Sequence, residues 1–230
     1  MDILLILAKW SDLSFAYYLE QTMITLLIVF VATFCAYLLG IPVGILLNVT
    51  DKNGLYESSA INKILGVIVN ILRSAPFIIL LVTILPIIRK VVGTGTGNVP
   101  FVIALVIAAF PFVARMVESS LKEMDYGVIE ATQAMGASKP RIIFTVMLPE
   151  IKSSLIVGAT ISFATILGYT AMAGTIGAEG LGNLAYQYGY IRNYTDAKII
   201  SLVLLIAIVQ IFQEIGMFIA KKLDHRRKGD

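Results

Sequence analysis

Long runs without a charged residue constrain this chain more than any other feature of its sequence. The charge-free windows cover residues 21–50, 74–88, 91–114, 153–178 and 199–213. A helix needs about 20 apolar residues to cross the hydrocarbon core of a bilayer. Three windows satisfy this outright, and the other two do so once Arg73 and Glu214 are allowed inside or near a span. The sequence therefore predicts an all-α membrane protein with five transmembrane helices, at about residues 20–49, 64–88, 98–122, 151–174 and 197–220.

The remaining composition agrees with a membrane protein. Only 14% of the residues are charged, against about 25% in ordinary soluble proteins. A transmembrane barrel would need repeated segments of about ten alternating residues, and the sequence has none. No linker or internal repeat divides the chain, so we expect one transmembrane domain over residues 1–230. Residues 1–8 lack the basic region and cleavage site of a signal peptide, and we expect a short interfacial segment there.

The distribution of lysine and arginine predicts the orientation of the chain, because cytoplasmic loops carry an excess of these residues. With the N-terminus outside, twelve fall on the cytoplasmic side and five outside, with Arg73 left out. The twelve are Lys52, Lys63, Arg115, Lys122, Lys139, Arg141, Lys152, Lys221, Lys222, Arg226, Arg227 and Lys228, and the five are Lys9, Arg89, Lys90, Arg192 and Lys198. We therefore expect a multi-pass membrane protein with its N-terminus outside, its basic tail as a cytoplasmic anchor, and residues 123–150 in the cytoplasm.

The sequence offers no candidate catalytic or metal site. It has no Gly-x-x-x-x-Gly-Lys-Ser/Thr pattern and therefore no nucleotide-binding P-loop. The single histidine, His225, lies in the basic tail and cannot complete a Ser/His/Asp set. Cys35 is the only cysteine, so there is no disulfide framework. The net charge of +3 is explained by the topology and predicts no nucleic-acid partner. We expect no enzymatic activity, no cofactor and no metal on this chain.

The loop of residues 123–150 has a helical pattern of its own. Glu130, Ala131, Ala134 and Met135 share helical spacing, so a short helix would present small residues on one face. Gly136 can adopt the left-handed conformation that ends a helix. The run Val146-Met147-Leu148-Pro149 then leads into the fourth span. This pattern alone is equally compatible with a docking site and with a connection that packs only on its own bundle.

Residues 130–149 resemble the cytoplasmic EAA signature of the permease subunits of ATP-binding-cassette (ABC) importers. That signature reads Glu-Ala-Ala, three residues, Gly, nine residues, then Ile-x-Leu-Pro. The matching positions are Glu130, Ala131, Gly136, Leu148 and Pro149, while Thr132 replaces the second alanine and Val146 the isoleucine. In that family the segment is a coupling helix that inserts into a cleft of a separate ATPase subunit. The resemblance therefore implies the fold of a type I ABC importer permease and assigns ATPase coupling to this loop.

Other segments are similar to methionine-import permeases, a subfamily that also has five spans per subunit. They are Arg73-Ser74-Ala75-Pro76-Phe77-Ile78-Ile79-Leu80-Leu81, Gly168-Tyr169-Thr170-Ala171-Met172-Ala173-Gly174, Gly180-Leu181-Gly182 and Tyr188-Gly189-Tyr190. This similarity implies a homodimer in a bacterial inner membrane that carries L-methionine, with D-methionine as a further candidate. It further implies two ATPase subunits that bind ATP and Mg²⁺, and an extracytoplasmic methionine-binding protein.

Candidate residues for the pathway and its gate come from the second and fourth spans. Arg73 would lie inside a span, where arginine costs about 2.5–3.5 kcal/mol, so it either ties helices together or lines the pathway. Pro76 can kink that span. Small residues recur every four positions in the fourth span, and this stripe either lines the dimer axis, with its last member at the outer gate, or packs within the chain. The small residues are Thr160, Ala164 and Gly168, and Met172 continues the stripe one turn later.

Three alternatives stay open at the level of the sequence. The cargo of such an importer is methionine or, alternatively, another amino acid or a small peptide. A secondary transporter driven by an ion gradient is a further alternative, although the chain shows neither inverted repeats nor a chain of intramembrane acids. The tyrosines at 186, 188, 190 and 194 form either an aromatic belt at the membrane interface or a contact for a substrate-delivering protein.

Overall fold

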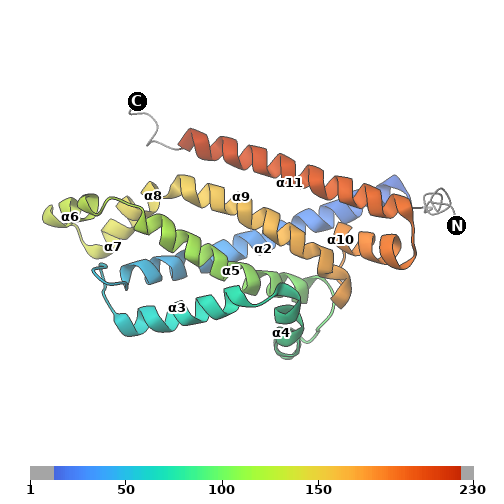
Figure 1. Ribbon diagram of the computed structural model, residues 1–230, viewed down its shortest axis with the longest axis horizontal. Coiled ribbons are helices and arrows are strands. Elements are labelled where there is room, and N and C mark those ends of the chain that lie inside the picture. Colours follow the sequence, from blue (N-terminus) through green and yellow to red (C-terminus); the bar gives the residue numbers. More distant parts are fainter. Residues whose placement is uncertain (1–12, 224–230) are drawn as a thin grey trace. The chain divides into compact units, whose positions relative to one another are not determined.

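The computed structural model describes residues 13–223, which are helical apart from short connections (Figure 1). The expected N-terminal interfacial segment and residues 224–230 of the basic tail lie outside the described part of the chain. The elements in chain order are α2 (Phe15–Val49), α3 (Ser59–Ser74), α4 (Phe77–Val92), α5 (Asn98–Lys122), α6 (Tyr126–Ala134), α7 (Lys139–Ile142), the π-helical segment η1 (Ile143–Met147), α8 (Leu148–Glu150), α9 (Lys152–Tyr169), the 3₁₀ segment η2 (Thr170–Ile176), α10 (Leu181–Leu184), the π-helical segment η3 (Ala185–Ile191) and α11 (Thr195–Leu223).

The all-α membrane fold is confirmed, with one correction to the second span. Among the described residues, α2, α5, α9 with η2, and α11 are each long and apolar enough to cross a membrane. A fifth span exists only if α3 and α4 are taken together as a broken pair. The expected continuous helix over residues 64–88 is therefore wrong. Its interruption lies at Ala75–Pro76, because Pro76 disfavours helix for the residue before it and has no N–H to donate.

The other spans differ from the predicted bounds mainly at their ends. Helix α5 begins and ends where the sequence predicts. Helix α2 begins at Phe15 rather than near residue 20, and α11 extends to Leu223. In the fourth span the α-helix ends at Tyr169 and continues as the 3₁₀ segment η2. Charge-free length thus locates the apolar middle of a span, while polar and charged residues extend the helix beyond it.

The described chain divides into two compact units, each built from three separate stretches. Unit 1 contains the chain up to Cys35, Ala75–Ala108 and Phe163–Gln213. Unit 2 contains Ala36–Ser74, Ala109–Ser162 and the chain from Glu214 onward. Because each predicted span contributes a piece to both units, no linker in the sequence marks their boundary.

Aromatic contacts hold the core of unit 1 together. Phe77, the first residue of α4, is buried and stacks on Tyr169 with ring centroids 4.4 Å apart. It also meets Phe101 of α5 edge-to-face at 6.1 Å. Phe163 of α9 stacks on Phe212 of α11 at 4.2 Å. Such pairs contribute about 0.5–1.5 kcal/mol each beyond their buried area, so they fix the first turn of α4 against the end of α9.

Close helix packing characterises unit 2. Gly40 and Gly44 of α2 lie against α5, and a Cβ at Gly44 would come 2.5 Å from the carbonyl oxygen of Ala114. Small residues four positions apart let helix backbones approach closely in a membrane. The Tyr37 hydroxyl donates a hydrogen bond to the carbonyl of Leu155 at 2.9 Å and so connects α2 with α9. These contacts fix the helices from which the loop of residues 123–150 emerges.

Candidate docking site

The loop of residues 123–150 contains the short helix that its sequence pattern predicts. Helix α6 is capped by Asp125, whose carboxylate accepts a hydrogen bond from the backbone N–H of Gly127 at 2.8 Å. Such caps stabilise a helix by about 1 kcal/mol. The chain turns away at Gly136, whose φ of 82° lies in the left-handed region that favours glycine. The loop is therefore a built structure with a defined start and end.

One face of this loop is anchored in unit 2. Ile129 of α6 is buried, and so are Ile142 of α7 and Met147 of η1. Apolar burial contributes about 25 cal/mol per Å² of buried surface. Burial of these side chains therefore packs the three short elements against the helices of unit 2. Each short element has at least one buried residue, and η1 has a second, Ile143, so all three elements are oriented by packing.

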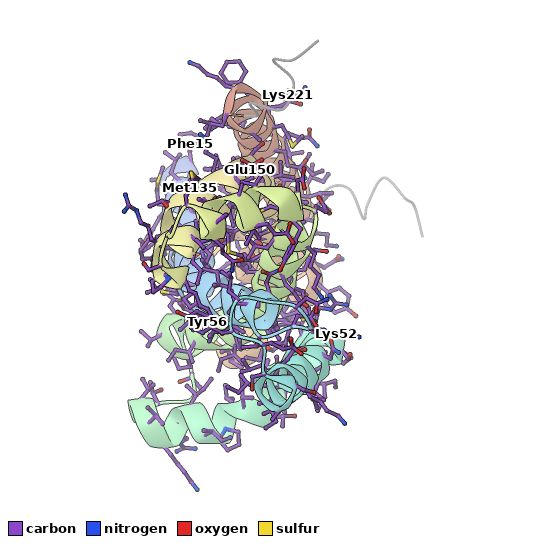
Figure 2. The ribbon with its side chains drawn as sticks, turned by 90° about the vertical axis from the view of Figure 1, so that its left-hand side faces the viewer. Phe15, Lys52, Tyr56, Met135, Glu150 and Lys221 are labelled. Carbon is purple, nitrogen blue, oxygen red and sulfur yellow. The ribbon has the colours of Figure 1, made fainter. Side chains whose placement is uncertain are left out.

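The opposite face of the loop is exposed. Glu130, Ala131 and Ala134 of α6 are exposed, and Met135 is 79% exposed. Phe144 of η1 is 67% exposed. Large apolar side chains left outside the hydrocarbon region commonly mark contact surfaces. Figure 2 views the structure from the side on which α6 and α7 lie and labels Met135 there.

The remaining signature residues divide between the two faces. Thr132, in place of the second alanine, is half-buried, and its hydroxyl donates to the carbonyl of Val128 at 2.6 Å. The substitution therefore leaves no unpaired hydroxyl. Leu148 is half-buried and Pro149 is exposed. Both lie in α8, which follows the π-helical segment η1 rather than opening the fourth span directly as expected from the sequence. Segments of π-helix are frequent at functional sites.

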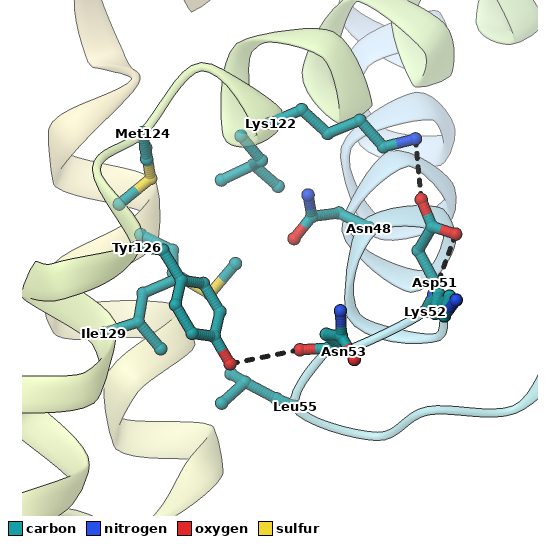
Figure 3. Close-up of a pocket in the computed structure, with 12 residues that line it drawn as sticks. Asn48, Asp51, Lys52, Asn53, Leu55, Lys122, Met124, Tyr126 and Ile129 are labelled. Carbon is teal, nitrogen blue, oxygen red and sulfur yellow. Dashed lines mark hydrogen bonds and ion pairs between the residues drawn. The ribbon is translucent and has the colours of Figure 1, made fainter.

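The loop also contacts the connection between α2 and α3. The Tyr126 hydroxyl donates to the carbonyl of Asn53 at 3.2 Å, and the ammonium of Lys139 lies 4.8 Å from the ring centre of Tyr56. A cavity of about 310 Å³ lies beside this contact (Figure 3). It is lined by Asn48, residues 51–55, Leu121, Lys122, Met124, Tyr126, Ile129 and Met147. The N-terminal end of α6 is therefore positioned by the turn that follows α2.

Asp51 and Lys122, which line this cavity, belong to a set of four charged residues of alternating sign. Arg115 pairs with Glu118 at 2.6 Å, Lys122 pairs with Glu118 at 2.9 Å, and Lys122 pairs with Asp51 at 2.7 Å. Hydrogen bonds from Lys122 and from the backbone N–H of Lys52 hold the pKa of the Asp51 carboxyl below its usual value. This set was not predicted from the sequence, although the charges at 115, 118 and 122 share one helix face.

The candidate pathway residues of the second span differ in their local structure. Arg73 is exposed in the last turn of α3, which does not fit the alternative in which it ties helices together within the chain. Pro76 has extended backbone angles, φ −60° and ψ 133°, and precedes α4. The expected kink is therefore a complete break in the helix.

The stripe of small residues in the fourth span is not uniform. Thr160 is buried, and a Cβ at Gly216 of α11 would come 1.9 Å from its hydroxyl oxygen, so this member packs within the chain. Ala164 is half-buried, Gly168 is exposed with open space above its Cα, and Met172 is half-buried in η2. Only the later part of the stripe is accessible for a contact outside the chain.

The glycine-rich segment, residues 174–183, is held by side chains that the sequence analysis did not single out. The Gln21 side-chain carbonyl accepts from the N–H of Gly180 at 2.7 Å. The Thr25 hydroxyl accepts from the N–H of Leu181 at 2.8 Å. Gln21 and Thr25 are both buried on α2. The Asn98 side-chain carbonyl accepts from the N–H of Glu179 at 2.7 Å. Polar residues one turn apart in an apolar span were the available signal.

The tyrosine cluster forms two aromatic contacts in unit 1. Tyr186 and Tyr190 stack with ring centroids 5.8 Å apart, and Tyr190 is 73% exposed. Tyr188 meets Tyr17 edge-to-face with ring centroids 6.1 Å apart, and the guanidinium carbon of Arg192 lies 4.4 Å from the centre of the Tyr188 ring. Within residues 13–223 no group of His, Cys, Asp and Glu side chains is placed to hold a metal ion.

Known proteins resemble this chain over most of its length. The sequence profile of the family described as "Binding-protein-dependent transport system inner membrane component" matches residues 40–229. The "Probable D-methionine transport system permease protein MetI" of Vibrio cholerae serotype O1 is 42% identical over 220 residues, which cover 96% of this chain and 98% of that protein. The "Methionine import system permease protein MetP" of Bacillus subtilis (strain 168) is 44% identical over 181 residues, covering 79% and 82% of the two chains.

A solved structure has the same fold. It is described as "Inward facing conformations of the MetNI methionine ABC transporter: CY5 native crystal form". The TM-score is 0.89 at 40% sequence identity, and the match covers 93% of this chain and 100% of the other.

Proposed function

Because the chain belongs to the family of binding-protein-dependent transport system inner membrane components, we propose that it is the permease subunit of an ATP-driven importer of methionine. The observation that carries the proposal is the exposed face of α6 and η1, on a loop anchored by buried residues on its other side. The relatives from Vibrio cholerae and Bacillus subtilis are both named for methionine transport. We infer that L-methionine and also D-methionine are carried.

The partners of the proposed importer follow from its class. Two copies of this chain pair about a two-fold axis, since closed C2 pairing is the commonest assembly of identical subunits. Two ATPase subunits bind the two loops of residues 123–150 and hold the ATP and Mg²⁺, so that this chain carries no cofactor and hydrolyses no ATP. An extracytoplasmic protein delivers methionine. In this arrangement the loop lies in the cytoplasm and the N-terminus lies outside, consistent with the excess of lysine and arginine on the cytoplasmic side.

The geometry of the loop suits it to transmit movement. Glu130, Ala131 and Ala134 offer a face of mostly small residues, so another surface can approach the α6 backbone closely. Gly136 ends the helix at a fixed point, and Met135 beside it adds an adaptable apolar contact. Closure of the ATPase pair on ATP then displaces the loop, with Thr132, Leu148 and Pro149 holding its internal shape. ATP hydrolysis and release of the products return the loop to its starting position.

The pathway is proposed to pass the exposed residues of the broken span and of α9. Arg73 precedes the break in the second span, and Pro76 lies at it. Gly168 and Met172 are accessible at the far end of α9 and in η2, with Ala164 one turn before them. We assign the outer gate to Met172 and its neighbours. Thr160 has a packing role, since it is buried against Gly216.

Uptake of radiolabelled methionine into proteoliposomes tests the proposal. The vesicles contain this chain with its ATPase and binding protein, with or without internal ATP. We expect uptake that requires ATP and that excess L- or D-methionine inhibits. Inhibition by another amino acid or peptide instead would keep the importer and replace the cargo. Uptake that proceeds equally without ATP would support a secondary transporter.

Two loop variants test the coupling role separately from the cargo. Glu130→Lys reverses a charge on the exposed face of α6, and Gly136→Asp adds a charged side chain just after the helix. We expect the fold to tolerate both changes and the ATPase contact to be weakened by both. We expect both variants to insert normally and to retain about tenfold less ATPase in a co-purification, a change of about 1.4 kcal/mol. Glu20→Lys, the same charge reversal at an exposed position of α2 in unit 1 and outside the loop, is the control. Normal binding and transport by both variants would remove the assignment.

A further inference from the structure

The carboxylate of Glu118 connects two parts of unit 2 through charges of alternating sign. It lies on α5, only 5% of the residue is exposed, and each of its oxygens meets a different cation. Arg115 lies one turn before it and Lys122 one turn after it. A buried carboxylate is costly to desolvate unless its partners are well placed. Here both cations lie within ion-pair distance of Glu118, and each also contacts another element of unit 2.

On one side the connection leads to α3. The guanidinium of Arg115 donates to the carbonyl of Gly66 at 3.0 Å and to the side-chain oxygen of Asn70 at 2.9 Å. Both acceptors lie on α3, and α3 ends at Ser74, directly before the break in the second span. The planar guanidinium binds these groups and Glu118 with separate N–H groups, which a lysine cannot reproduce. The position of α5 and the position of α3 are therefore linked.

On the other side the connection leads to the loop of residues 123–150. Lys122 reaches Asp51, the first residue of a tight turn in which the N–H of Gly54 donates to the Asp51 carbonyl at 2.9 Å. The same turn presents the carbonyl of Asn53 to the Tyr126 hydroxyl. Tyr126 is the first residue of α6. Polar contacts thus run without interruption from α3 to the beginning of the proposed ATPase-docking helix.

Lys122 is the member of this set whose side chain can move most freely. Its ammonium lies 2.9 Å from Glu118 and 2.7 Å from Asp51, on a flexible four-carbon stem with three donors. It can therefore shift between the two carboxylates as the turn moves, whereas Arg115 and Glu118 are more enclosed. A well-packed apolar set would stabilise the helices equally well, so stability alone does not account for four charges here.

We propose that Glu118 is a positioning residue that couples displacement of the loop of residues 123–150 to α3, at the break in the second span. This inference rests on the proposed function, because it requires an ATPase that moves the loop. Residues 115, 118, 122 and 51 touch neither the cargo nor the ATP in this account. Contiguous contacts alone do not establish coupling, so the test must measure transport per ATP hydrolysed.

The decisive variant is Glu118→Gln, which keeps the size of the side chain and removes its charge. In proteoliposomes with the ATPase and binding protein, we expect methionine uptake per ATP hydrolysed to fall about tenfold, while co-purification of the ATPase is unchanged. The matched control is Glu20→Gln, an exposed glutamate on α2 in unit 1 and outside the loop, for which the ratio stays at the wild-type value. A wild-type ratio in Glu118→Gln would overturn the proposal.

Asp51→Asn tests the same connection at its exposed end, where folding is not at risk. We expect a smaller loss of uptake per ATP, about threefold, as suits an exposed ion pair. The double variant should lose no more than Glu118→Gln alone, because both act on one connection. A loss in the double variant that equals the product of the two single losses would contradict the proposal, and so would an unchanged ratio in Asp51→Asn. Absence of ATP-dependent uptake by the unmodified chain would instead remove the proposed function.

Discussion

The glycine-rich segment of unit 1 and the loop of residues 123–150 in unit 2 both interrupt the spans, but they are held in opposite ways. In the glycine-rich segment, backbone N–H groups bond to neutral side chains, two of which, Gln21 and Thr25, are buried. In the loop, apolar residues anchor one face while Glu130 and Met135 are exposed on the other. The first arrangement fixes a backbone conformation, and the second presents a surface.

This difference teaches where each region tolerates change. Buried hydrogen bonds are costly to leave unmade, and a backbone packed against backbone has no room for a side chain. Exposed side chains are bound only by what docks on them, and surface substitutions usually change stability by less than about 0.5 kcal/mol. Substitutions in the glycine-rich segment should therefore reduce folding, while those on the exposed loop face should reduce coupling.

The largest expected effect comes from Gly182→Ala. A Cβ at Gly182 would lie 2.1 Å from the carbonyl oxygen of Thr170, where the obstacle is backbone. We expect a loss of about 3 kcal/mol or more in the free energy of unfolding, as for severe overpacking, measured by denaturant unfolding in detergent. Gly136→Ala is the matched control, since its Cβ meets open space and only the positive φ opposes it, at about 1 kcal/mol. Equal losses of unfolding free energy in the two variants would contradict the expected difference between the glycine-rich segment and the loop.

Thr25→Val sharpens the contrast with a nearly isosteric change. It removes the hydroxyl that accepts from the N–H of Leu181 and leaves that group buried and unpaired. We expect a loss of about 1–3 kcal/mol in the free energy of unfolding. Thr22→Val serves as the control, because the hydroxyl of Thr22 only donates to the carbonyl of Tyr18 within its own helix. A loss no larger than that of the control would show that the bond to Leu181 contributes little.

The smallest expected effect is the pH dependence of the Asp51 contact. The folded-state pKa of Asp51 lies below its ordinary value, so its contribution to stability is present above about pH 4 and is lost as pH falls through the folded-state pKa. Asp51→Asn should therefore lower the thermal midpoint near neutral pH, by the equivalent of at most about 1 kcal/mol, and this difference should shrink as pH falls through the folded-state pKa of Asp51. A difference that grows toward low pH would contradict this sign.

Much of the architecture was predictable because membrane insertion demands long apolar helices. The all-α class, the span positions and the helix ended by Gly136 all follow from charge-free windows and one local pattern. The complete break at Pro76 was not, since proline inside a span often only kinks it. Pro42, Pro86 and Pro111 all remain inside helices of this chain. Which prolines break a helix depends on packing around them, such as the stacking of Phe77 on Tyr169.

The site was predictable only on its exposed side. Glu130, Ala131 and Gly136 were assigned to coupling from a local pattern and a family resemblance, and their role stays a prediction. The supporting residues Arg115, Glu118 and Asp51 come from separate helices and turns, so only the folded chain shows that they meet. The same holds for Gln21 and Thr25, whose acceptor groups meet a segment about 160 residues later in the chain.

Thiol protection tests the central claim, that the exposed loop face is the docking surface. Cysteine is introduced at Met135 in a chain whose native Cys35 is replaced by alanine, and the rate of maleimide labelling is measured in detergent with and without the ATPase. We expect the ATPase to slow labelling at position 135 at least about tenfold and to leave a cysteine at the exposed Thr94 of unit 1 unaffected. Equal labelling of Met135→Cys with and without bound ATPase would contradict the account.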